Sequence, residues 1–386
     1  MKKNITILCI ICSLWIVCRK PESSAGSNFC PLCNMIGILY LSTQTASCTA
    51  IQEAAMDSIL SNTYSEVDFS FSVERSDGHR YTFNRGTSTM QNRYESASTS
   101  KLVTAVIIMR LVEKGYLNLT DTPVTLIPGW PIPNTDSLYT LTLADLLSFT
   151  SGLTLEPPPS LILSCIDKPA ANFDACVIDI ANTNAANGKI PGNEFYYAST
   201  HLQVAGLMAI KARNATLSVS GTWQDVFTEF KTETGLFPSS TYELPSVTNP
   251  RLAGGMIWTG DEYMAFLKAL KSNSLLKSAS MNQLLADHTS AATGTALSTN
   301  SPVYSRLGED WHYGFGLWHE CESASYNCTL GTRISSPGAY GAYPFWDRTH
   351  DYFGIVARQG ALGTFQNGIA IERSVHAALN KWAACH

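Results

Sequence analysis

A serine three residues ahead of a lysine, at the start of a long apolar stretch, constrains this chain more than any other feature. In the run Glu95-Ser-Ala-Ser-Thr-Ser-Lys-Leu-Val-Thr-Ala-Val, Ser98 and Lys101 occupy positions i and i+3, which lie one above the other on one face of a helix. The apolar stretch 102–111 buries that helix, and low local dielectric together with the positive helix N-terminus favours a deprotonated lysine and an ionising serine. The pair therefore predicts a serine nucleophile with Lys101 as its base.

The spacing alone is not specific, because Ser274 and Lys277 repeat it. Context separates the two copies. Ser98 lies where a polar segment meets a long helix that Gly115 ends, as a glycine just past a helix C-terminus does. Ser274 lies near the tail of a candidate helix that starts at Asp261, among small polar residues. We therefore interpret Ser98 as the nucleophile and Ser274 as an exposed serine.

A second motif lies downstream, where Pro191-Gly-Asn-Glu-Phe195 precedes Tyr197-Ala-Ser199. Here the chain resembles the serine β-lactamase and penicillin-binding-protein superfamily, in particular its class C and family VIII esterase branch. The second motif of that branch is Tyr-x-Asn following Pro-Gly-x-x-Phe. The resemblance implies that Tyr197 works with Lys101 as the general base, and that Ser199 replaces the asparagine that holds an acyl amide.

Other segments agree with that superfamily in order and spacing over roughly residues 50–385. They are Arg110–Asp121, Leu146–Leu153 with Phe149 in place of a histidine, Ala253–Asp261, and Tyr313–Leu317. The resemblance implies an α+β fold, in which an antiparallel sheet built from both chain ends is flanked by helices. A mostly helical lobe completes this β-lactamase/transpeptidase-like architecture, with the site between the two parts.

The third motif of the relatives, Lys-Thr-Gly or His-x-Gly, falls on Ser336-Pro-Gly338, so its cation is absent. In β-lactam-processing relatives that cation helps to hold a substrate carboxylate. The resemblance implies that Ser336, Gly338 and Ser199 line the substrate site, and that the backbone N–H groups of Ser98 and Ala339 form the oxyanion hole. Losing a polar donor relaxes the preference for a substrate that needs it, so the changes argue against antibiotic or D-alanyl-peptide chemistry.

The function that follows is a secreted serine hydrolase of carboxylesterase type that cleaves a small ester or amide through an acyl-enzyme and needs no cofactor. Two other functions fit the family: a catalytically inactive binding or structural protein, and a D-alanyl peptidase or β-lactamase. The intact Ser98, Lys101 and Tyr197 favour the enzyme. The histidines show no metal-ligand spacing, so we expect no metal. A net charge of -5 does not indicate the basic surface that binds nucleic acid.

The first residues are typical of a targeting segment, because Lys2 and Lys3 precede an apolar run, 5–18, that is too short to span a bilayer comfortably. We expect export, with membrane attachment only if this segment stays uncleaved. The expected organisation is a signal peptide or anchor (1–25), an N-terminal segment (26–47) and a hydrolase domain (48–386), whose α/β lobe comprises 48–97 and 330–386 and whose helical lobe comprises 98–329.

An even number of cysteines follows the targeting segment, as expected for disulfides in an oxidising compartment. Cys165 with Cys176, and Cys321 with Cys328, are close enough in sequence to close local loops. Cys48 with Cys385 would join the chain ends if the terminal elements pack side by side; free buried thiols are the alternative. Three sequons in the expected mature region permit glycosylation in a eukaryotic source: Asn118, Asn214 and Asn327.

Alternation of apolar and polar residues over 67–74 predicts a strand, and Ser76-Asp-Gly78 predicts a turn into a second strand over 79–84. A late strand is expected over 352–358 and a final helix over 366–384. Strands at both ends with helices between them predict a sheet assembled from the two termini.

Overall fold

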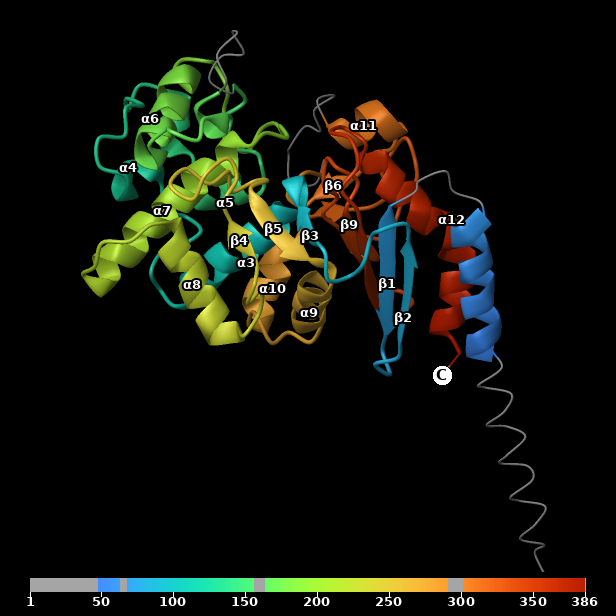
Figure 1. Cartoon of the computed structure of the whole chain (residues 1–386). Coiled ribbons are helices and arrows are strands. Elements are labelled where there is room, and N and C mark those ends of the chain that lie inside the picture. The colour runs from blue at the N-terminus through green and yellow to red at the C-terminus, as the bar shows by residue number, and fades with distance from the viewer. Residues whose placement is uncertain (1–47, 63–67, 156–163, 291–300, 386) are drawn as a thin grey trace, which may run out of the picture.

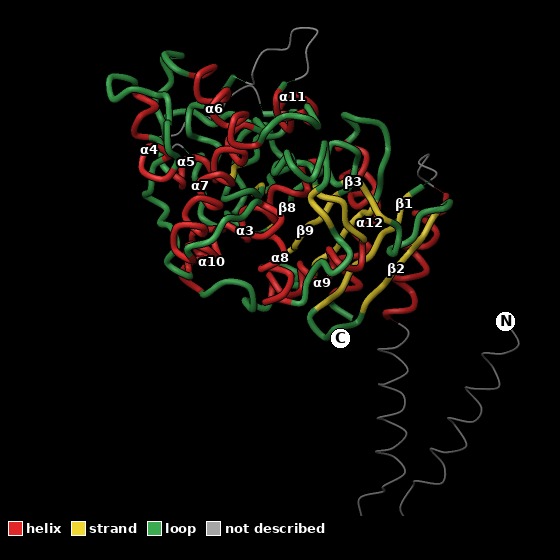
Figure 2. Tube along the Cα trace, turned by 60° about the vertical axis from the view of Figure 1, so that its left-hand side comes forward, coloured by secondary structure: helices red, strands yellow, loops and turns green. Residues whose placement is uncertain are grey.

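The computed structural model describes residues 48–62, 68–155, 164–290 and 301–385. A mostly helical part and a part that contains the larger sheet lie side by side (Figures 1 and 2). The predicted signal and N-terminal segments lie outside the described residues. The described strands are β1 (Phe69–Arg75), β2 (Arg80–Arg85), β3 (Arg93–Glu95), β4 (Thr241–Tyr242), β5 (Met256–Thr259), β6 (His312–Tyr313), β7 (Trp318–His319), β8 (Arg333–Ser335), β9 (Tyr343–Asp347) and β10 (Tyr352–Ala357).

The helices begin with an unlabelled helix over residues 48–62. The labelled α-helices are α3 (Ser100–Glu113), α4 (Pro123–Leu126), α5 (Leu143–Leu147), α6 (Phe173–Asn184), α7 (Thr200–Leu217), α8 (Trp223–Thr234), α9 (Gly260–Lys271), α10 (Ser278–Leu284), α11 (Pro302–Leu307) and α12 (Phe365–Ala383). Short 3-10 helices are η1 (Ala97–Thr99), η2 (Ser137–Thr140) and η3 (Cys165–Asp167).

The larger sheet has seven strands in the order β2-β1-β10-β9-β8-β7-β6, and each neighbouring pair is antiparallel. The strand nearest the N-terminus therefore pairs with the last strand, with Arg75 opposite Tyr352 and Ser70 opposite Ala357. This confirms the predicted α+β fold with a sheet built from both chain ends. A smaller sheet, β3-β5-β4, lies between this sheet and the helices.

Strand β1 is buried on both faces, although its sequence alternates between apolar and polar residues. Helices α12 and 48–62 cover one face of the sheet, and α9 packs against the other (Figure 1). The buried hydroxyl groups of β1 are bonded, Ser72 Oγ to Thr82 Oγ1 (2.9 Å) and Ser70 Oγ to Ser88 Oγ (3.1 Å). Hydrogen bonding is what allows a polar face to be covered at little cost in stability.

The chain ends are joined as the cysteine positions predict. Cys48 forms a disulfide with Cys385, and the indole of Trp382 in α12 donates to Glu53 Oε1 (3.0 Å). The other two predicted pairs, Cys165–Cys176 and Cys321–Cys328, are also disulfides. All three predicted pairings are confirmed.

Helix α3 forms the centre of the helical part and is packed by α7, α8 and α10. Because it is apolar almost all round, eleven of its fourteen residues are buried, as expected for a core helix. It ends where the sequence predicts, at Gly115, whose φ of 74° suits glycine.

Three elements inside the stretch predicted as a helical lobe, 98–329, belong structurally with the larger sheet. Strand β7 pairs with β8 on one side and with β6 on the other. Helix α9 packs on β10. Long-range pairing of such short strands has no local sequence signal, which is why the lobe boundary predicted at 329 does not follow the sheet.

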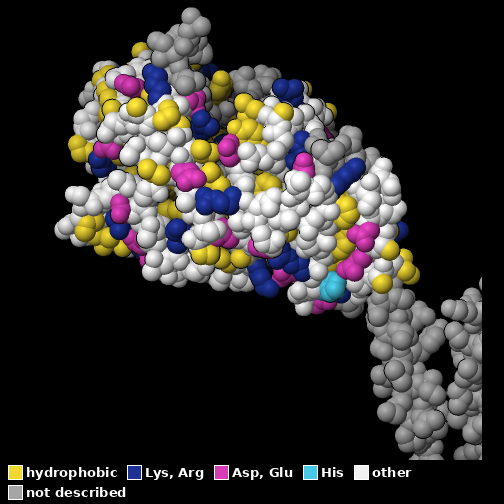
Figure 3. Space-filling view, viewed as in Figure 1, with side chains coloured by type: hydrophobic (Ala, Val, Ile, Leu, Met, Phe, Trp, Pro, Cys, Tyr) yellow, Lys and Arg dark blue, Asp and Glu magenta, His cyan; other side chains and the backbone are white. Residues whose placement is uncertain are grey.

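Acidic and basic side chains are interspersed on the face shown in Figure 3. Among the described residues, we found no helix with the length and apolar character needed to cross a bilayer.

Candidate active site

Ser98 lies in the 3-10 turn η1, immediately before α3, and Lys101 lies in the first turn of that helix. Lys101 Nζ donates to Ser98 Oγ at 2.7 Å. The lysine is only 4% exposed, whereas Ser98 keeps partial access to solvent. The i, i+3 spacing therefore brings the two groups into contact as predicted, with a buried amine next to a hydroxyl that a substrate can reach.

A strained backbone position presents Ser98. Ala97, the residue before it, has a φ of 44°, a left-handed conformation that is uncommon for residues other than glycine. Its carbonyl accepts hydrogen bonds from the hydroxyls of Ser96 (3.1 Å) and Ser100 (2.9 Å). Ser100 Oγ also accepts from Met256 N (3.2 Å), which ties the turn to β5. Such conformations persist only where surrounding contacts fix them.

Lys101 has a second partner, the carbonyl of Ala253, at 2.9 Å. The loop that carries this carbonyl is held from two sides, because Leu252 O accepts from Thr104 Oγ1 in α3 (2.8 Å) and Leu252 N donates to Gln203 Oε1 in α7 (3.2 Å). Because Ala253 O accepts one hydrogen of Nζ, the nitrogen stays oriented toward Ser98.

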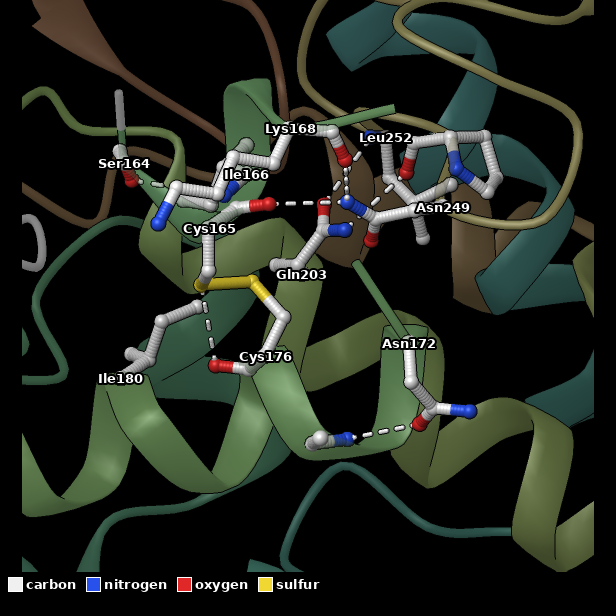
Figure 4. The surroundings of a disulfide bond; sticks show 12 residues. Ser164, Cys165, Ile166, Lys168, Asn172, Cys176, Ile180, Gln203, Asn249 and Leu252 are labelled. Carbon is white, nitrogen blue, oxygen red and sulfur yellow. Dashed lines mark hydrogen bonds between the residues drawn. A yellow bond between two sulfur atoms is a disulfide. The ribbon is translucent and has the colours of Figure 1, made fainter. Parts of the chain in front are cut away.

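The Cys165–Cys176 disulfide supports the same loop from behind (Figure 4). It joins η3 to α6, and the side-chain amide of Asn249 donates to the carbonyls of Cys165 (2.8 Å) and Lys168 (3.0 Å). This network connects the segment that begins at residue 164 to the loop that orients Lys101.

Tyr197 completes the group expected at the site. Lys101 Nζ lies 4.6 Å from the centre of its ring. Burial of the hydroxyl raises the pKa of Tyr197 well above its ordinary value, while nearby Ser98 and Trp318 side chains act in the opposite direction. Tyr197 is therefore protonated in the resting protein, with a hydroxyl that faces Ser98. The ring stacks on Trp318, with centroids 5.3 Å apart.

Phe149 stands where the superfamily that this chain resembles has a histidine. It has a φ of 63° and is fully buried. Its ring stacks on His201 at 4.8 Å and lies 5.5 Å from Tyr197. His201 is bonded at both ring nitrogens, to Ser151 Oγ and to Tyr196 O, each at 2.8 Å. Burial lowers the pKa of His201 to about 3, so it is neutral and fixes the segment that carries Tyr197.

The third-motif residues border the turn that carries Ser98. Ser336 is 3% exposed, and its hydroxyl donates to the carbonyls of Ser98 (3.2 Å) and Gly316 (3.4 Å). A Cβ on Gly338 would lie 2.4 Å from Ser96 O, so only glycine fits there. Ala339 follows with partial exposure. The structure thus brings Ser336, Gly338 and Ala339 to Ser98, with Ser336 turned toward backbone carbonyls.

Ser199 lies at the N-terminal end of α7, two residues after Tyr197. The second Ser-x-x-Lys copy is different. Ser274 is exposed and donates to Ala269 O (3.0 Å), and Lys277 is exposed as well. This agrees with our interpretation of Ser274 as an exposed serine.

Sequence reasoning missed several supporting groups. Ala253 lies in a segment that the sequence analysis used only for its resemblance to the superfamily. Nothing in a single sequence indicates that the Ala253 carbonyl contacts Lys101. Trp318 next to Tyr197 has no signal either. Ser96 and Ser100 did have a sequence signal. The run Ser-Ala-Ser-Thr-Ser is rich in small hydroxyl side chains, which form hydrogen bonds with nearby backbone groups.

In its mixed antiparallel fold, this chain holds a buried amine against an accessible serine hydroxyl, as a serine nucleophile and its base require. Its family follows from the sequence: the model of the family described as Beta-lactamase matches residues 73–368, and the chain belongs to that family.

Solved structures agree on the fold. A putative beta-lactamase from Bacteroides dorei is 23% identical with a TM-score of 0.68, over 85% of this chain and 98% of that one. EstCE1, "a hydrolase with promiscuous acyltransferase activity", is 16% identical with a TM-score of 0.67, over 86% and 99%. Protein flp of Staphylococcus aureus (strain N315) is 28% identical over 137 residues, which are 34% of this chain and 26% of that protein. This chain therefore matches about a quarter of the length of Protein flp.

Proposed function

We propose that this chain is an exported serine hydrolase of carboxylesterase type that forms an acyl-enzyme on Ser98. The observation that carries the proposal is the 2.7 Å contact between Ser98 Oγ and the buried amine of Lys101. A hydroxyl becomes a nucleophile when a base lies within hydrogen-bond reach, and the base in turn needs a third group to orient it. The carbonyl of Ala253 is that third group.

In the proposed reaction, Lys101 in its neutral form accepts the proton of Ser98 as Oγ attacks the substrate carbonyl carbon. The negative charge that develops on the carbonyl oxygen is bound by the N–H groups of Ser98 and Ala339, each worth about 3 kcal/mol of barrier. Tyr197, protonated at rest, gives its proton to the leaving oxygen and regains one from Lys101. Water then cleaves the acyl-enzyme by the reverse transfers.

The residues at the second and third motifs favour an ester over a β-lactam. Ser199 lacks the amide of the family asparagine, and Ser336 is an uncharged residue whose hydroxyl is already bonded to Ser98 O and Gly316 O. Neither supplies a cation for a substrate carboxylate. EstCE1 is a hydrolase with promiscuous acyltransferase activity. We therefore propose that this chain hydrolyses a small ester, with an alcohol as an alternative acyl acceptor.

The test is acylation of the purified full chain by a fluorophosphonate and by a fluorescent penicillin, with the labelled residue located by mass spectrometry. We expect fluorophosphonate on Ser98, turnover of short-chain aryl esters, and loss of both in Ser98→Ala. Ser274→Ala is the matched control and should behave as the wild type. Equal ester turnover in wild type and Ser98→Ala would refute the assignment, and a wild type that neither reagent labels would indicate an inactive scaffold.

The three disulfides support export, because such bonds persist in oxidising compartments. Two sequons are suited to glycosylation, since Asn118 and Asn327 are exposed. Asn214 is less suited, because its side-chain amide donates to Gly221 O at 2.9 Å within the folded chain. Peptide mapping without reduction, on protein from the native host, tests for the three disulfides and therefore for export. Free thiols at all six positions would refute export.

A further inference from the structure

Arg358 follows β10 and is only 3% exposed. Its Nη1 donates to the carbonyl of Tyr340 at 2.6 Å and to Thr364 Oγ1 at 2.9 Å. Tyr340 directly follows Ala339 in the turn between β8 and β9, and Thr364 is the N-cap residue of α12. The guanidinium therefore joins the turn that carries the proposed oxyanion donor to the start of the last helix.

Two glycines make room for this guanidinium. A Cβ on Gly341 would lie 2.0 Å from Nη1 of Arg358, and a Cβ on Gly360 would lie 2.2 Å from Nη2. Gly341 also has a φ of +93°, which favours glycine. The planar fork fills a space shaped for it, and a lysine ammonium, with a single nitrogen, would not occupy the same volume.

Backbone contacts hold the rest of the turn. Ala339 O accepts from Gly363 N (2.8 Å) and Thr364 N (3.0 Å), and Gly341 N donates to Gly338 O (2.8 Å). In a trans peptide the N–H points away from the C=O of the same unit, so the Ala339 N–H points opposite to the bonded Gly338 carbonyl. This N–H makes no hydrogen bond to any residue in the described ranges.

The direction of that N–H matters because Gly338 packs against the nucleophile turn, where a Cβ would meet Ser96 O at 2.4 Å. The segment after β10 also holds that turn from its other end, since Gln359 Oε1 accepts from Glu95 N at 2.9 Å. The position of the Ala339 N–H relative to Ser98 therefore depends on the residues just after β10.

We propose that Arg358 is a positioning residue for the oxyanion hole: it fixes the Tyr340 carbonyl and thereby the direction of the neighbouring Ala339 N–H. This inference rests on the proposed acyl-enzyme chemistry at Ser98. Arg358 acts through the backbone and does not touch the substrate. A misplacement of about 1 Å in a catalytic group costs on the order of 100-fold in rate, so loosening this turn should lower the rate of acylation.

The experiment compares Arg358→Met and Arg358→Lys with the wild-type full chain, using an aryl butyrate and its thionoester. In Arg358→Met we expect kcat for the oxygen ester to fall about 10- to 100-fold with KM changed less than about 3-fold, because the donor acts in the transition state. The preference for oxygen ester over thionoester should shrink, since a loosened hole discriminates less between oxygen and the larger sulfur. Arg358→Lys should recover part of the rate.

Arg75→Met is the matched control. Arg75 is 7% exposed in the same part of the fold, and its Nη1 likewise donates to one carbonyl, Trp382 O (2.9 Å), and one hydroxyl, Thr49 Oγ1 (3.3 Å). It should lose stability but keep kcat and the oxygen-to-sulfur preference.

Unchanged kcat in a folded Arg358→Met variant overturns this inference alone, as does an equal loss in Arg75→Met or an equal fall for both esters. A wild type without esterase activity or fluorophosphonate labelling at Ser98 overturns the proposed function and this inference with it.

Discussion

Replacing Tyr197 by phenylalanine tests the proton path and removes a single oxygen. The ring keeps its contacts with Trp318 (5.3 Å between centroids) and Phe149 (5.5 Å), so packing should be preserved. A hydroxyl that is already desolvated contributes only about 1 kcal/mol to folding. Proton transfer by a positioned side chain is worth about 10²- to 10⁴-fold in rate, or roughly 3–5 kcal/mol of barrier. Tyr197→Phe should therefore lose activity far out of proportion to stability.

The assay is kcat/KM for an aryl butyrate, measured beside the urea midpoint of unfolding. Tyr313→Phe is the matched control, because Tyr313 is 1% exposed and its ring lies 6.2 Å from Tyr197 in the same aromatic cluster. It should retain activity within about 3-fold, as expected for a hydroxyl outside the proton path. If Tyr197→Phe keeps more than about a tenth of wild-type activity, Lys101 alone accounts for the transfer. An equal loss in Tyr313→Phe would assign the effect to packing.

Three further changes have expected outcomes. Cys48→Ser with Cys385→Ser should lower the free energy of unfolding by up to about 6 kcal/mol, because the bond closes a loop with a sequence separation of 337; urea titration measures this, and a loss near zero would contradict the loop argument. A hydrogen bond to the buried glutamate one turn earlier raises the pKa of His376, so its stabilisation is complete below about pH 6.5 and is lost as the pH rises through the raised pKa. The urea midpoint of His376→Gln should thus fall further below the wild type at about pH 5.5 than at about pH 9, and equal differences would refute this. Ser199→Asn with Ser336→Lys should speed acylation by penicillin, since a restored charge-assisted contact is worth about 1.5–3 kcal/mol; mass spectrometry of the adduct over time would show no gain if carboxylate recognition lies elsewhere.

Features set by local spacing were predictable from the sequence. The Ser98–Lys101 contact follows from helix periodicity, and Gly115 marks a helix end because few other residues adopt its conformation. The first strand was predictable because alternation marked it, and the last because a short apolar run is typical of a buried strand. The other strands of the same sheet, β6, β7 and β8, could not be predicted, since they have only two or three residues each.

The supporting parts of the site were not predictable, because each depends on a contact between distant segments. The carbonyl of Ala253 is a backbone group, which every residue has, and only the fold brings it to Lys101. Alternation in β1 indicated a polar face, but packing by α9 buried that face as well. The left-handed conformation of Phe149, whose ring packs on Tyr197 and His201, likewise has no local sequence signal.

The pairing of β1 with β10 also has a consequence for how the protein is made. During synthesis at ~5–20 residues per second, β1 emerges roughly 15 s to a minute before β10. Until then, the edge of β1 that will pair with β10 has no partner, and Phe69, Phe71 and Val73 lack the cover they have in the finished fold. An unpaired edge with alternating aromatic residues is a template for aggregation. Recombinant fragments that stop before residue 352 should therefore be insoluble, and a host that keeps the nascent chain unfolded until it is complete should give more protein.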